Sequence, residues 1–181
     1  MLGKLIKFSV LTLLAYLLQV TTVDSIALWG VAPNIALALI SIVTVALGRK
    51  YTFVMSMVIG YCLEIMVPAL DYINLILYPV AAMLAALAFS DKTERKLEEE
   101  RTRGKKRLQL NAHLRAPLAA LLSILLFEGI HMGYISLSGV ELDSGHWRRA
   151  LIDVGYTTLL SAVLQFPIRW WLGTYKLKKA R

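Results

Sequence analysis

The chain has 181 residues, of which 57% are hydrophobic, and its 20 Lys and Arg against 12 Asp and Glu give a net charge of +8. This composition excludes an ordinary soluble domain, and it makes the basic excess a matter of membrane topology rather than of nucleic-acid binding. The single cysteine, Cys62, excludes an intrachain disulfide and a metal cluster built on thiolates.

Six apolar stretches follow one another along the chain, each long enough for an α-helix to cross about 30 Å of hydrocarbon. They run approximately over residues 5–23, 29–47, 51–67, 72–89, 116–137 and 150–172. The stretches lack the alternation of barrel strands and are about twice as long as such strands. The sequence therefore predicts an all-α, polytopic membrane protein that forms one domain of six transmembrane helices.

The basic residues are distributed unevenly between the loops that join these spans. If the helices alternate in direction, 18 of the 20 Lys and Arg lie on one face, and only Arg148 and Arg149 lie on the other. By the positive-inside rule, both termini are predicted to be cytoplasmic. The basic face also suits the anionic headgroups of membrane lipids.

The third span contains Ser56, Gly60 and Glu64 at intervals of four residues. Residues at this spacing share one face of a helix. The small Ser56 and Gly60 therefore predict close approach by a neighbouring helix. Glu64 predicts a polar contact across that crossing, because a carboxyl group within a membrane must be paired, protonated or wet.

Residues 90–115 form the one sizeable polar segment, and their charged core predicts either a helix that prolongs the fourth span or a solvated linker. The loops on the opposite face are short. Activity is therefore expected within the membrane or at its cytoplasmic surface.

The fifth span contains Glu128 and His131 on one face, and Gly129 and Gly133 at the spacing of a close helix crossing. Three interpretations compete. Glu128 and His131 form an internal pair, or the segment contacts a partner helix, or the two side chains bind a ligand or carry protons. The sequence shows no second intramembrane acid of matching depth, which disfavours the third interpretation.

The sixth span carries a polar ridge, because Asp153, Thr157, Ser161 and Gln165 recur every four residues. A lipid-facing helix would not carry this pattern, so the ridge is expected to face the bundle interior or another protein.

Motifs of catalysis are missing from the sequence, which has no phosphate-binding glycine loop, no paired-histidine metal helix and no nucleophile elbow. The prediction is a protein without cofactor, metal or enzymatic activity. A membrane lipid enzyme would need an acid pair with a metal, for which Glu64 and Glu128 are the candidates.

Several short pieces, in order, resemble the MreD family of rod shape-determining proteins. They are residues 30–34 (Gly-Val-Ala-Pro-Asn), residues 46–49, Gly60 with Glu64, Phe127 with Glu128, and Tyr156 with residues 166–169. Together they extend over nearly the whole chain. The chain departs from the family at Glu64, where Asp is more usual, and at Thr157 and Thr158, where Asn is common.

The resemblance implies a bacterial inner-membrane protein whose bundle is similar to the substrate-binding S-components of energy-coupling factor transporters. It implies a non-enzymatic scaffold of the cell-wall elongation (Rod) complex. The implied partners are MreC, a single-span protein with a large periplasmic domain, the RodA polymerase, its penicillin-binding transpeptidase and the MreB cytoskeleton. The alternative is an S-component of a vitamin transporter, but such subunits carry an Ala-xxx-Ala pair on their first helix, where this chain has only Ala15.

Overall fold

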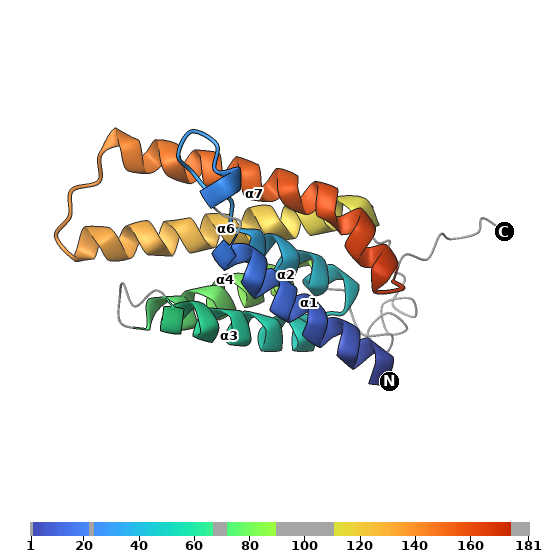
Figure 1. Ribbon diagram of the computed structural model, residues 1–181. Coiled ribbons are helices and arrows are strands. Elements are labelled where there is room, and N and C mark those ends of the chain that lie inside the picture. Colours follow the sequence, from blue (N-terminus) through green and yellow to red (C-terminus); the bar gives the residue numbers. More distant parts are fainter. Residues whose placement is uncertain (1, 22–23, 67–71, 90–110, 175–181) are drawn as a thin grey trace, which may run out of the picture.

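The computed structural model describes residues 2–21, 24–66, 72–89 and 111–174, and in these residues every regular element is a helix. In chain order they are α1 (Leu2–Thr21), the short 3-10 helix η1 (Asp24–Ile26), α2 (Ile35–Ala46), α3 (Arg49–Met66), α4 (Ile73–Phe89), α6 (Ala112–Leu137) and α7 (Ser144–Trp171) (Figure 1). The predicted all-α class is confirmed. The charged core of residues 90–115 lies outside the described residues.

Among the described residues, three helices are long and apolar enough to cross a membrane. They comprise residues 3–21 of α1, 113–137 of α6 and 144–171 of α7. The apolar helices α2 and α4 are shorter, with 12 and 17 residues, and α3 has 18 residues. These lengths and compositions are those of a helical membrane protein.

Helix α2 is shorter than the predicted second span, because it begins at Ile35 and not near Trp29. Trp29 and Gly30 have positive φ angles of 52° and 75°, which form a turn. Pro33 also disfavours helical geometry in the residue before it. At 1.5 Å per residue the helix is about 18 Å long, which is too short to cross the hydrocarbon by itself.

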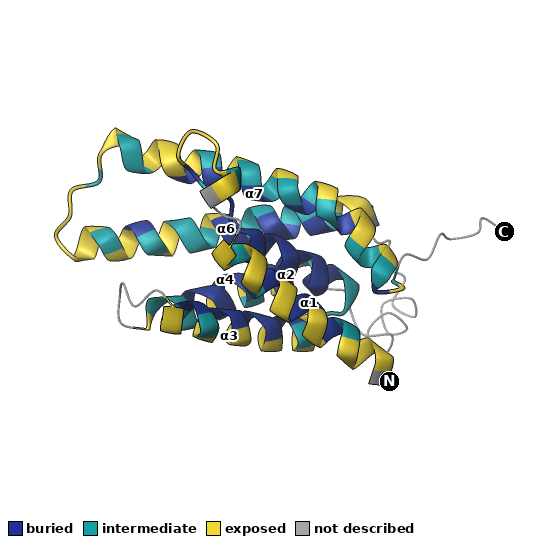
Figure 2. Ribbon diagram, viewed as in Figure 1, coloured by how far each residue is buried: buried dark blue, intermediate teal, exposed yellow. Residues whose placement is uncertain are grey.

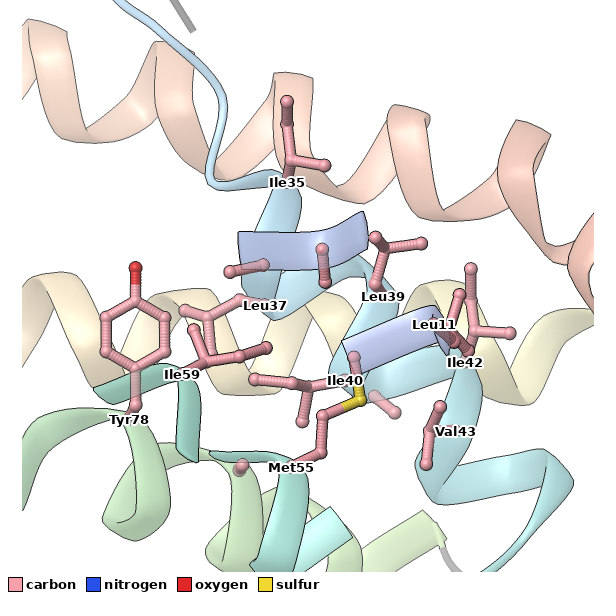
Figure 3. Close-up of a cluster of buried hydrophobic side chains, with 14 of the residues drawn as sticks. Leu11, Ile35, Leu37, Leu39, Ile40, Ile42, Val43, Met55, Ile59 and Tyr78 are labelled. Atoms are coloured by element: carbon pink, nitrogen blue, oxygen red, sulfur yellow. The ribbon is translucent and has the colours of Figure 1, made fainter. Parts of the chain in front are cut away.

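Helix α2 lies at the centre of the bundle. Every residue from Ile35 to Val45 is buried, and α2 contacts α1, α3, α4, α6 and α7. Figure 2 shows α2 buried along its length, whereas α1 and α3 expose one side. Its side chains form one apolar cluster with Leu11 of α1, Met55 and Ile59 of α3 (Figure 3). The other helices therefore enclose α2.

Helix α1 begins and α7 ends at the same end of the bundle (Figure 1), and basic side chains form hydrogen bonds with helix ends there. Lys7 Nζ donates to the carbonyl oxygen of Trp171 at 2.7 Å. The Arg49 guanidinium donates to the carbonyl oxygens of Ala86 and Leu87, each at 3.3 Å. These cations satisfy carbonyl groups at the ends of α7 and α4, where the helix dipole favours positive charge.

Gly60 and Glu64 of α3 lie where α3 packs against the start of α4. A Cβ atom at Gly60 would lie 2.7 Å from the carbonyl oxygen of Asn74 and 3.3 Å from the Cα of Leu75. Glu64 Oε1 accepts the N–H of Tyr72 at 3.0 Å, and Oε2 accepts the N–H of Asn74 at 2.8 Å. The carboxylate predicted to make a polar contact across this crossing thus caps the start of α4.

Gly60→Ala is expected to lower the free energy of unfolding in detergent by about 1–3 kcal/mol, because the added methyl group meets the backbone of α4. The matched control is Gly155→Ala on α7, where a Cβ atom meets nothing within 4 Å. The control is expected to preserve or raise stability, since alanine favours helix by about 1 kcal/mol. Denaturant titrations followed by circular dichroism measure both, and equal stability of the two variants would contradict the close crossing.

Candidate functional site

The start of α2 lies inside the bundle, where its free backbone N–H groups need partners. The first N–H groups of any helix lack partners within the helix, and an unsatisfied group in hydrocarbon costs several kcal/mol. The N–H of Asn34 donates to Thr157 Oγ1 at 2.8 Å and to Asp153 Oδ1 at 3.2 Å. Two residues of the predicted polar ridge on α7 therefore cap α2.

Side chains from α1 and α4 complete this cap. Gln19 Oε1 of α1 accepts the N–H of Ala36 at 3.0 Å. Asn34 Oδ1 accepts the N–H of Leu37 at 3.0 Å and the hydroxyl of Tyr78 from α4 at 3.2 Å. The start of α2 is thus held by hydrogen bonds to three other helices.

An acid pair lies beside this cap. The carboxyl groups of Glu128 on α6 and Asp153 on α7 are hydrogen-bonded to each other. Such a bond requires that one carboxyl group keeps its proton. Asp153 Oδ1 already accepts the Thr157 hydroxyl at 2.7 Å and the N–H of Asn34. Because these donors favour a charged Asp153, Glu128 is the group that holds the proton and donates it.

This pair corrects two sequence-based expectations. Glu128 bonds to Asp153 rather than to His131, and a second acid of matching depth does exist. Glu128 lies nine residues before Leu137, where α6 ends, and Asp153 lies nine residues after Ser144, where α7 begins. Equal spacing from the α6–α7 turn is therefore the signal from which the pair could have been predicted. His131 lies instead beside Phe127, with ring centroids 6.3 Å apart.

A cleft of about 380 Å³ opens beside the acid pair, between α6, α7 and the segment that precedes α2. Glu128, His131, His146, Arg149 and Asp153 supply its polar lining. Asp153 is only 9% exposed, whereas the Arg149 side chain is exposed to solvent. The cleft therefore leads from a charged rim to a buried carboxylate.

The start of α7 fixes one wall of this cleft. Asp143 Oδ1 accepts the N–H of His146 at 3.0 Å and lies 2.7 Å from His146 Nδ1. The hydrogen bond from the His146 backbone holds the pKa of Asp143 below its usual range. Asp143 is thus an N-cap that also holds the imidazole of His146 in place.

The other predicted polar residues donate hydrogen bonds within the bundle, although Gln165 Oε1 is buried without a hydrogen-bond partner among the described residues. Ser161 and Gln165 are buried on α7, where Ser161 Oγ donates to the carbonyl of Ala116 at 3.4 Å and Gln165 Nε2 to that of Ala162 at 3.1 Å. Ser56 is buried at the α3–α4 crossing, and its Oγ donates to a carbonyl of its own helix at 3.0 Å. Each of these donors therefore has its acceptor inside the bundle.

Gly129 and Gly133 have a different environment from Gly60. Both are exposed on the C-terminal half of α6, and a Cβ atom at either position would meet nothing within 4 Å. Figure 1 shows that this half of α6 and the first half of α7 extend beyond the end of α3 and the start of α4. No described residue of the chain covers the glycine pair.

Comparison of the chain with family models, with curated proteins and with solved structures gives no match. Function therefore has to follow from the residues themselves. Among the described residues, no three His, Cys, Asp or Glu side chains are grouped as metal ligands. The arrangement offers a capped helix start, a cleft with an acid pair and an uncovered glycine pair.

Thr157→Val is expected to lower the free energy of unfolding by about 1–3 kcal/mol, because it removes an acceptor of the buried Asn34 N–H and a donor to Asp153. The control is the adjacent Thr158→Val, whose hydroxyl is buried without a hydrogen-bond partner in the described part of the chain. This control is expected to be neutral or stabilising. Unfolding in detergent, followed by tryptophan fluorescence, measures both, and equal losses would show that the cap of α2 is unimportant.

Proposed function

We propose that the protein is a non-enzymatic scaffold of the bacterial cell-wall elongation complex, similar to MreD. A partner helix packs against the C-terminal half of its helix α6. The supporting observation is the uncovered glycine pair Gly129 and Gly133. Small residues let a second helix approach the backbone closely, and the resulting van der Waals packing is one of the forces that drive helix association in a bilayer. The neighbouring Ile130 and Tyr134 are exposed and supply apolar contact area.

The proposed topology has six spans in the inner membrane with both termini in the cytoplasm. The short α2 is extended by residues 31–34, which are buried or half-buried against the bundle, whereas residues 28–30 are exposed. The described cations Lys4, Lys7, Arg49 and Lys50 belong to α1 and α3 at the end where α7 finishes. That end is assigned to the cytoplasm, where positive charge and anionic lipids meet.

The proposed occupant of the glycine pair is the single transmembrane helix of MreC. RodA, its penicillin-binding transpeptidase and the MreB cytoskeleton complete the proposed assembly. A scaffold of this kind needs no catalytic residues. The side chains of the ridge from Asp153 to Gln165 form hydrogen bonds inside the bundle. Both carboxylate oxygens of Glu64 likewise accept backbone N–H groups at the start of α4. The binding surface is therefore the part of the chain that its own side chains leave uncovered.

A second candidate function is substrate capture for an energy-coupling factor transporter, which the cleft beside Glu128 favours. In transporters, the N-termini of interrupted transmembrane helices bind anionic substrate groups through their free N–H groups. Here the N–H groups of Asn34, Ala36 and Leu37 are occupied by side chains of the chain itself. The helix start is thus closed to an anionic substrate, which favours the scaffold.

Gly133→Leu is expected to reduce co-purification of MreC from native membranes about tenfold, because the side chain blocks close helix approach worth about 1–2 kcal/mol. The control is Gly155→Leu, at an equally uncovered glycine on α7. Quantitative mass spectrometry of the retained proteins provides the measurement. Undiminished MreC with Gly133→Leu would refute the glycine face, and recovery of an ATPase module with a vitamin-like molecule would establish the second candidate.

A further inference from the structure

The cleft beside the acid pair is separate from the glycine face. The residues of α6 that line the cleft are Glu128, His131, Met132 and Ile135, and neither Gly129 nor Gly133 is among them. A partner helix on the glycines would therefore leave the cleft free. The scaffold described above uses neither the cleft nor the proton of Glu128.

The cleft combines an acid pair with an apolar wall. Met132 and Ile135 lie on its α6 side. The charged and titratable groups that face Glu128 are Asp153, Arg149 and His146 on α7, His131 on its own helix and Tyr78 on α4. Since one proton is shared by two carboxyl groups, the resting pair carries one negative charge, and Arg149 balances it at the rim.

The chemistry of the cleft excludes most ligand classes. An anion would meet Asp153 and would find the N–H groups of α2 already occupied. A metal ion needs several ligating groups, and no suitable set of three exists in the described ranges. A cation with an apolar body satisfies both the carboxyl groups and the apolar wall. A volume of about 380 Å³ is at the small end of the range for ligand sites.

We propose that the cleft binds an organic monocation, a primary ammonium or guanidinium group on a short alkyl body, between the carboxyl groups of Glu128 and Asp153. The ligand replaces the shared proton. The protonated Glu128 releases its proton to solvent, both carboxylates then contact the cation, and the net charge of the site stays the same. One proton leaves for each cation bound, so affinity increases about tenfold per pH unit while free Glu128 is protonated.

Isothermal titration of the full chain in detergent micelles with n-butylammonium chloride tests this exchange between pH 6 and pH 8. The expected result is millimolar or tighter binding that strengthens with pH, with release of about one proton per cation. Proton release is read from the heat difference between two buffers of unequal ionisation enthalpy. Equal binding of uncharged n-butanol, or binding of n-butylammonium without proton release, would overturn the proposal.

Three variants distinguish loss of the cation site from misfolding of the protein. Glu128→Gln is expected to abolish both the pH dependence and most of the binding. Arg149→Gln is expected to tighten binding roughly threefold, since it removes a like charge from an exposed rim. A gain of affinity cannot arise from misfolding. Glu141→Gln, an exposed acid outside the cleft, is expected to change nothing. Weaker binding in Arg149→Gln, or the same loss in Glu141→Gln as in Glu128→Gln, would contradict the assigned site.

The source of the cation is decided by a parallel titration with a lysine-containing tripeptide blocked at both ends. Binding of n-butylammonium alone assigns the cleft to a free small amine. Comparable binding of the peptide assigns it to a basic side chain of a protein, and either result supports a cation site. Binding of neither probe would refute it.

Discussion

The buried start of α2 is the constraint on which the bundle depends. A helix that begins inside an apolar bundle presents free N–H groups where no water is available. Gln19, Tyr78, Asp153 and Thr157 have to meet at that point, and they come from α1, α4 and α7. Their convergence fixes the depth and rotation of three helices around α2. The apolar cluster around α2 contributes buried surface to the arrangement that these polar contacts specify.

This constraint also separates the polar groups that build the fold from those that remain for function. The side chains that cap α2 and α4 already accept hydrogen bonds from the backbone. Ser161 and Gln165 of the α7 ridge donate hydrogen bonds inside the bundle. What remains lies at the end of the bundle formed by the α6–α7 hairpin. There the glycine pair on α6 is uncovered, and a cleft leads to Glu128. Both features suit binding, one of a helix and one of a small cationic group.

Much of the fold could be predicted from hydropathy, because apolar runs of helical length have few alternatives in a membrane. The starts and ends of α1, α3 and α4 agree with the predicted spans within a few residues. Helix α2 does not, since hydropathy cannot distinguish an apolar segment that turns from one that forms a helix. The dipeptide Pro33-Asn34 was the available signal, because the residue before proline avoids helical geometry and Asn is a good N-cap.

The site was less predictable, because its contacts join distant parts of the chain. The spacing of Asp153 and Thr157 indicated a ridge that avoids lipid, but it could not indicate that the partner is the backbone of Asn34. Likewise, Glu64 indicated a contact across the α3–α4 crossing without showing that its acceptor oxygens cap α4. Periodicity reports which face of a helix is polar, whereas the partner depends on how the helices are stacked.

The most direct test of the scaffold is an electron cryomicroscopy structure of the complex purified from native membranes in mild detergent. The expected structure has a single transmembrane helix, from a protein with a periplasmic domain, packed against Gly129 and Gly133 of α6. A complex in which these glycines face only lipid, or in which the partner helix packs on α1 or α3 instead, would contradict it.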